Sequence, residues 1–145
     1  LDTNIAFSAI LNTESRIGDL IMNSNGILEF QACETLRSEL KKHRPKLLEL
    51  SKMNEEQLDE SIFQVTNCLH FTNEALIPLE YWLKAANLVR DIDMNDIAFV
   101  ALAEFQGIKL WTGDRELMRG LAKKGYTNFI SIDELIKLRS LIEQG

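Results

Sequence analysis

The sequence predicts an α/β fold, a three-layer α/β/α sandwich with a mostly parallel central sheet of about four to five strands. Two observations favour this class. Segments with helical periodicity alternate with short apolar segments of strand-like composition along the 145 residues. Carboxylates stand at predicted joints: Asp2 and Asp114 follow strand residues, and Asp96 opens a helix. Because open α/β sheets bind their ligands at the carboxyl ends of strands, these acids indicate where a site lies.

Length and composition are those of one globular domain, predicted to span residues 1–145. The chain is 46% hydrophobic and 26% charged, which suits a buried core and argues against disorder. No apolar run is long enough to cross a bilayer, and no signal-peptide pattern opens the chain. Two cysteines, Cys33 and Cys68, do not make a disulfide framework. We therefore expect a cytoplasmic protein without a membrane partner.

The formal net charge of −6 restricts the ways in which the chain can meet a nucleic acid. A binder that relies on general attraction to phosphate needs basic charge, which argues against a histone-like protein. An enzyme whose bound metal ions neutralise the acids is not excluded.

The first half of the chain is predicted to be mainly helical. Asp2 precedes a helix over residues 5–11, as at a strand-to-helix joint, and we expect residues upstream of Leu1 to complete the missing strand. Pro45 cannot sit inside an unbroken helix, so we expect a kink or a new helix there. The remaining predicted elements are a helix over 15–22, a strand over 27–33, helices over 34–42 and 46–52, and a helix to about Asn67 opened by a capping box at Asn54–Gln57.

The second half alternates strands and helices more regularly. Pro78 suits the first turn of a helix that runs to about Val89, and Gly107 and Gly125 each end a helix. The predicted elements are strands over 69–72, 108–112 and 128–131 and helices over 97–106, 116–124 and 133–143. The helix-rich part, about 34–67, is predicted to be a helical arm of the same domain.

Several acids are candidates for one site, and each also has a simpler interpretation. Asp96 and Asp114 could each be a helix N-cap, Asp2 a solvated surface acid, and Glu39 an exposed helix charge. The sequence leaves the role of Asp93 open between a solvated charge and a group in the outer shell of a metal ion. If the acids converge, they repel one another and need a cation to stay ionised together. Oxygen ligands suit Mg²⁺ or Mn²⁺, and two such ions can hold a phosphodiester and activate water.

Three motifs carry a resemblance to a known family. Leu-Asp-Thr-Asn opens the chain, Asp-Ile-Asp-Met-Asn-Asp at 91–96 precedes Phe-Val-Ala-Leu-Ala, and Leu-Trp-Thr-Gly-Asp ends at Asp114. Together they resemble the PIN domain, a metal-dependent ribonuclease fold, from Asp2 to the strand near Ile130. Glu39-Leu40-Lys41-Lys42-His43 resembles the helix that carries the second acid of the family, although Glu34 is an alternative. The absent first strand departs from the family pattern.

The resemblance implies that the protein cleaves single-stranded RNA with Mg²⁺ or Mn²⁺. The catalytic and metal-binding acids would be Asp2, Glu39, Asp96 and Asp114, with Asp93 as an auxiliary ligand. Asn4 and Thr112 would support the site by hydrogen bonding. Many such domains are toxins silenced by an antitoxin protein, and a homodimer is plausible for the family.

Basic residues near these motifs are candidates for binding the RNA backbone. Arg115 and Arg119 lie one helical turn apart beside Asp114, and Lys42 belongs to a basic run with His43 and Lys46. These side chains could touch substrate phosphate, or they could be ordinary solvated charges.

Two other classes of function fit the sequence less well. A non-catalytic PIN-like module that binds RNA or protein has no need of the acidic quartet. A phosphotransfer enzyme of the haloacid type would need a second aspartate where Asn4 stands, and neither a P-loop nor a glycine-rich dinucleotide turn is present. The sequence therefore favours a metal-dependent ribonuclease.

Overall fold

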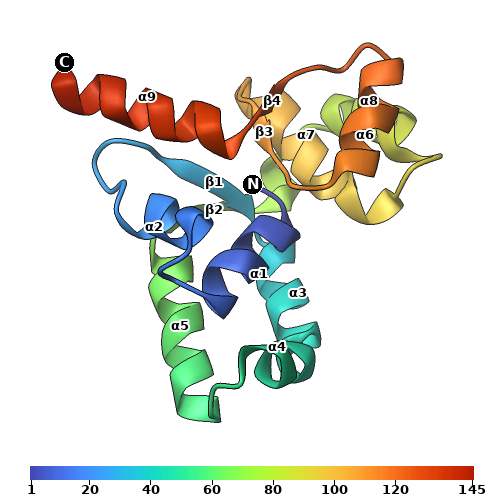
Figure 1. Ribbon diagram of the computed structural model, residues 1–145. Coiled ribbons are helices and arrows are strands. Elements are labelled where there is room, and N and C mark those ends of the chain that lie inside the picture. The colour runs from blue at the N-terminus through green and yellow to red at the C-terminus, as the bar shows by residue number, and fades with distance from the viewer.

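The computed structural model describes all residues 1–145 and has helices on both sides of short parallel strands (Figure 1). The elements are α1 (Thr3–Leu11), α2 (Arg16–Met22), β1 (Phe30–Cys33), α3 (Thr35–Lys42), α4 (Arg44–Ser51), α5 (Glu55–Asn67), β2 (Leu69–Thr72), the 3₁₀ helix η1 (Glu74–Leu76), α6 (Leu79–Val89), the 3₁₀ helix η2 (Met94–Asp96), α7 (Ile97–Gln106), β3 (Leu110–Trp111), α8 (Arg115–Lys123), β4 (Phe129–Ile130) and α9 (Ile132–Gln144).

Local sequence signals place several helix ends where they were predicted. Asn54 and Gln57 form a reciprocal capping box at the start of α5: the Gln57 N–H donates to the Asn54 side chain over 2.8 Å, and the Asn54 N–H donates to the Gln57 side chain over 3.0 Å. Gly107 ends α7 with φ +64°, a conformation that side chains with a Cβ disfavour. Pro78 is the N-cap of α6 and stands just before the first turn.

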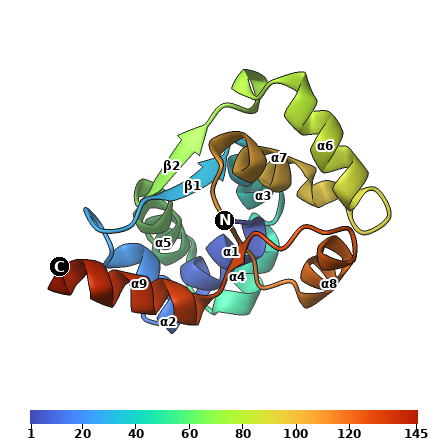
Figure 2. The same cartoon turned by 90° about the horizontal axis from the view of Figure 1, so that it is seen from above.

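The strands form two separate pairs, which corrects the prediction of one sheet with four to five strands. β1 pairs with β2 and β3 pairs with β4, both in parallel. The first two residues lie between the pairs: the Leu1 amino group donates to the Gln31 carbonyl over 2.9 Å, and the Asp2 N–H donates to the Trp111 carbonyl over 3.2 Å. Figure 2 shows the N-terminus near the middle of the molecule, consistent with this position. One bond to each side does not make a ladder, so the pairs remain distinct.

Two hydrophobic clusters lie on opposite sides of the strands. Phe30 of β1 and Trp111 of β3 stack with ring centroids 5.4 Å apart and belong to the cluster formed with α1, α2 and α5. Neighbouring Leu110 and the buried Cys33 belong to the other cluster, with α6, α7 and α8. Because successive strand side chains point to opposite faces, the helices cover both faces of the strands, as the α/β class requires.

The helices α3, α4 and α5 pack beside α1. Leu40, Leu47 and Leu58 from these three helices enter the same cluster as Ile5 and Ile10 of α1. Because of this packing, the turn between α3 and α4 lies next to one face of α1. None of the helices combines the length and the apolar character needed to span a membrane.

Candidate active site

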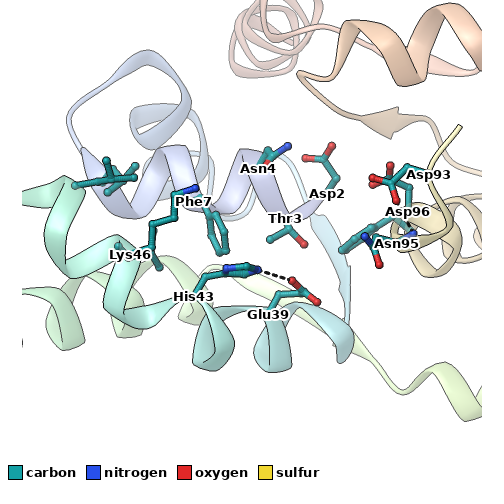
Figure 3. A pocket seen from close by; sticks show the side chains of 14 residues that line it. Asp2, Thr3, Asn4, Phe7, Glu39, His43, Lys46, Asp93, Asn95 and Asp96 are labelled. Carbon is teal, nitrogen blue, oxygen red and sulfur yellow. Dashed lines mark hydrogen bonds and ion pairs between the residues drawn. The ribbon is translucent and has the colours of Figure 1, made fainter.

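A cleft of about 400 Å³ lies where the start of α1, the α3–α4 turn and the start of α7 meet. Figure 3 shows Asp2, Asp93 and Asp96 at one end, and Phe7, His43 and Lys46 toward the other, with Glu39 between them. The lining residues are Asp2, Thr3, Asn4, Phe7, Leu11, Glu39, His43, Lys46, Leu47, Leu50, Asp93, Asn95, Asp96 and Phe99.

Asp2 is a buried carboxylate, only 3% exposed, so the alternative of a solvated surface acid is wrong. Its Oδ1 accepts a hydrogen bond from the Ile5 N–H over 3.1 Å, which caps α1, and its Oδ2 accepts one from the Thr112 hydroxyl. Burial raises the pKa of Asp2, the two hydrogen bonds oppose the rise, and the charge of Asp114 adds to it. Asp2 is therefore held in one orientation at the acidic end of the cleft.

Asp96 stands at the N-cap position of α7, but its side chain makes no capping hydrogen bond. Asp96 therefore occupies the predicted N-cap position without capping the helix through its side chain. Partial burial, and then the charges of Asp93, Asp2 and Asp114, raise the pKa of Asp96 to about 7. A carboxyl group that faces three others without a hydrogen-bond donor is poorly stabilised as an anion unless a cation joins it.

Asp114 and Asp93 use their side chains to cap helices. Asp114 Oδ1 accepts from the N–H groups of Glu116 and Leu117 over 3.0 and 3.1 Å at the start of α8, so its capping role is confirmed. Asp114 does not line the cleft, although its charge contributes to the raised pKa values of Asp2 and Asp96. Asp93 is exposed, lines the cleft and accepts from the Asn95 N–H over 2.9 Å.

Thr112 links two of the candidate acids through one buried hydroxyl. It donates to Asp2 Oδ2 and accepts from the Asp114 N–H over 3.0 Å. This single side chain therefore couples the end of β3 to the start of α1. Asn4, the other expected supporting residue, lines the cleft and is exposed, and it forms no side-chain hydrogen bond.

Glu39 and Glu34, the two candidates for the second acid of the site, lie in different places relative to the cleft. Glu39 lines the cleft, and its Oε2 lies 3.1 Å from His43 Nε2. Glu34 does not line it and forms an ion pair with Arg37 at 3.2 Å. The geometry thus places Glu39 with Asp2 and Asp96.

The donor set suits a hard cation, but the acids do not form a closed ligand group. All the candidate donors are oxygens, which Mg²⁺ and Mn²⁺ prefer. Nowhere does the structure gather three or more His, Cys, Asp or Glu side chains into a group that could hold a metal ion as it stands. The expectation of one tight quartet is therefore not met. Ionised carboxylates repel one another, and the hydrogen bonds of Asp2 and Asp114 hold them on their own helices.

The basic side chains in the cleft differ from those proposed for substrate binding. Lys42, Arg115 and Arg119 are exposed outside it, and Arg119 Nε donates to the Arg115 carbonyl over 3.4 Å. His43 and Lys46 line the cleft instead.

Phe7 lines the cleft, although no sequence motif marks it as a site residue. A spacing signal was available, because Thr3, Phe7 and Leu11 are four residues apart and share one side of α1.

A sequence profile described as PIN domain matches residues 1–134. The chain belongs to the PIN domain family. PIN domains are generally nucleases that use divalent metals, and the matched part contains every candidate acid from Asp2 to Asp114. Neither the curated proteins nor the solved structures contain a match to this PIN domain.

Proposed function

We propose that the protein is an endoribonuclease that hydrolyses phosphodiester bonds of single-stranded RNA with Mg²⁺ or Mn²⁺. The observation that carries the proposal is the position of Asp96. Its carboxyl group heads α7 without capping it and is close enough to Asp2, Asp93 and Asp114 for their charges to raise its pKa to about 7. A scaffold gains nothing from this arrangement, whereas a divalent cation would relieve the repulsion.

The metal would be held by Asp2, Glu39, Asp96 and Asp114, with Asp93 as an auxiliary ligand. When bound, it would supply positive charge to the phosphodiester and lower the pKa of the attacking water. Thr112 positions Asp2 through its hydroxyl and restrains the Asp114 backbone through the same atom. Asp114 sits outside the cleft, and its carboxylate is held by the N–H groups at the start of α8, so it would reach a shared ion only if this segment moved.

The protein must also attract an anionic substrate despite a net charge of −6. Lys46 lines the cleft, while Lys42, Arg115 and Arg119 are exposed beyond its lining. These cations would guide the RNA backbone, and the contribution of each would weaken as the salt concentration rises.

Cleavage of an unstructured RNA in Mn²⁺ tests the proposal, with the parent compared to Asp96→Asn and Asp114→Asn. Both substitutions remove a negative charge while keeping the side-chain volume. Loss of cleavage in both variants is expected. Equal cleavage by all three proteins would contradict the assignment, and RNA binding without any cleavage would favour a non-catalytic binding module of the same fold.

The same site suits the toxin of a toxin–antitoxin pair. The acidic end of the cleft is open, with Asp93 exposed, and an inhibitory protein could insert an arginine among these carboxylates. Expression of the chain alone should then arrest growth, whereas Asp114→Asn should not. A harmless parent would contradict the toxin role without touching the nuclease assignment. A homodimer, plausible for the family, would be tested by the mass of the purified protein in solution.

A further inference from the structure

The end of the cleft away from the acids is lined by an aromatic pair, a cation and aliphatic side chains. We propose that this end is a nucleobase subsite: a base of the RNA stacks against Phe7 beside His43, and Lys46 contacts the next backbone phosphate. The inference rests on the proposed function in one respect, namely that the ligand is single-stranded RNA.

The aromatic pair is arranged to accept a planar ligand. The Phe7 and His43 rings are 5.7 Å apart at their centroids, with planes inclined by 73°. Both residues line the cleft and neither is fully buried; the His43 side chain is 37% exposed. An edge-to-face pair leaves ring surface uncovered, and every base has a π-face that can stack on such a surface.

His43 adds a polar contact to the subsite. Its Nε2 lies 3.1 Å from Glu39 Oε2, and an ionised carboxylate only accepts hydrogen bonds, so Nε2 carries the proton. In the neutral imidazole Nδ1 is then an acceptor, and no group of the protein donates to it. An amino or imino N–H of a base can donate to it. The pair with Glu39 also fixes the His43 ring beside the acids, which joins the subsite to the reaction centre.

Lys46 is the free cation of this end of the cleft. It is exposed, lines the cleft and forms no ion pair with any acid of the chain. Figure 3 places Lys46 beyond Phe7 and His43 as seen from Asp2 and Asp96. One nucleotide therefore has a phosphate at the acids, a base at the rings and its neighbouring phosphate at Lys46.

The lining favours RNA over a helix of a partner protein. Only 5 of the 14 lining residues are hydrophobic, and Leu50, which is 57% exposed, is at the aliphatic end. A groove for an amphipathic helix would need a continuous apolar floor. Here the apolar surface is interrupted by His43, Lys46 and the carboxylates, which is the composition that base stacking and phosphate contact require.

The test is fluorescence anisotropy of a labelled single-stranded oligouridine with Ca²⁺ present, together with steady-state cleavage kinetics in Mn²⁺. Phe7→Leu keeps an apolar side chain but removes the ring. We expect it to weaken binding and to raise KM by roughly 10-fold while kcat changes little, because the variant loses the stacking of one base on an aromatic ring. Phe7→Tyr keeps the ring and should bind as the parent does.

Phe63→Leu is the matched control, because Phe63 is an exposed phenylalanine of α5 that does not line the cleft. It should leave binding unchanged. An oligonucleotide with abasic residues in place of its bases should bind the parent and Phe7→Leu equally. Lys46→Met should lower the slope of log affinity against log salt by about one, and exposed Lys137→Met on α9 should not.

Two results would overturn the subsite. One is parent-like binding by Phe7→Leu; the other is a Phe7→Leu defect that persists with the abasic oligonucleotide, which would mean a structural effect or a protein ligand. The proposed function can fail separately. A parent that binds the oligouridine through Phe7 but never cleaves it would support the subsite and contradict the nuclease activity.

Discussion

Asp96 and Asp114 both stand at the N-cap position of a helix, α7 and α8 respectively, yet their carboxyl groups have different partners. Asp114 accepts two backbone N–H groups, from Glu116 and Leu117, over 3.0 and 3.1 Å. Asp96 accepts none and faces the charges of Asp93, Asp2 and Asp114 instead. In chain position the two aspartates are equivalent, and only the fold distinguishes them.

The comparison distinguishes acids that stabilise the folded chain from acids that destabilise it. A capping carboxylate satisfies free N–H groups and stabilises its helix. An uncapped one among like charges destabilises the folded chain, and such strain is typical of functional sites. Asp2 combines both cases, because it caps α1 and is also buried near Asp114 and Asp96.

The largest expected effect is on catalysis. Asp96→Asn removes the uncapped charge and should reduce Mn²⁺-dependent RNA cleavage by at least about 100-fold, more than the loss typical of a group that only supports a metal ligand. Asp114→Asn should also lose activity, because asparagine keeps the cap but not the charge. Single-turnover cleavage of a labelled RNA measures both. Full activity in Asp96→Asn would contradict the role given to this residue.

The next effect concerns capping. Asp114→Ala should lower the free energy of unfolding by about 1 kcal/mol, because α8 loses its N-cap. Asp96→Ala should not lower it, since no capping hydrogen bond is lost from α7. Urea denaturation in EDTA compares the two variants with the parent. An equal loss of unfolding free energy in the two variants would mean that Asp96 and Asp114 do not differ in capping.

A related effect is on the pH dependence of stability without metal. The pKa of Asp96 is raised to about 7 by burial and by Asp93, Asp2 and Asp114. An aspartate in an unfolded chain titrates near about 3.9, so between these values the folded state holds a proton that the unfolded state has released. The contribution of Asp96 to the free energy of unfolding therefore falls as the pH rises from about 4 to about 7.

Because Asp96 is only half-buried, solvent screening limits this contribution to about 1 kcal/mol. Asp2, whose pKa is also raised, contributes in the same direction. Denaturation in EDTA at several pH values should show a smaller decline for Asp96→Asn than for the parent. An Asp96→Asn variant whose stability declines as much as that of the parent over this range would contradict the electrostatic description.

The smallest effect separates the two glutamates of the α3 region. Glu34→Gln breaks only a surface ion pair with Arg37 and should change stability by less than about 0.5 kcal/mol, without affecting cleavage. Glu39→Gln should reduce cleavage, because Glu39 lines the cleft. Kinetics of the two variants under identical Mn²⁺ concentrations decide between them, and a defect confined to Glu34→Gln would reverse the assignment.

Helices were largely predictable because their signals are local. The capping box at Asn54–Gln57, the helix end at Gly107 and the break near Pro45 follow from chemistry within a few residues. Strand pairing was less predictable. An apolar run such as 108–112 indicates a strand but not its neighbours, and here the strands form two separate parallel pairs.

The site was predictable as a list of residues but not as a geometry. Sequence motifs identified the acids, yet they could not separate Asp96 from Asp114, because both precede a helix. Phe7 was missed, since a half-buried aromatic residue on a helix has the pattern of a core residue. His43 and Lys46 were identified only as part of a basic run, and the packing of α3 and α4 beside α1 brings them into the cleft.

The central claim is that Asp96 is kept uncapped for a cation, and metal-dependent thermal unfolding tests it most directly. The parent should be stabilised by Mn²⁺, by about 2.7 kcal/mol at a concentration 100-fold above Kd. Asp96→Asn should be more stable than the parent in EDTA and should gain little from Mn²⁺. An Asp96→Asn variant that is less stable in EDTA and gains as much from Mn²⁺ as the parent would contradict the claim.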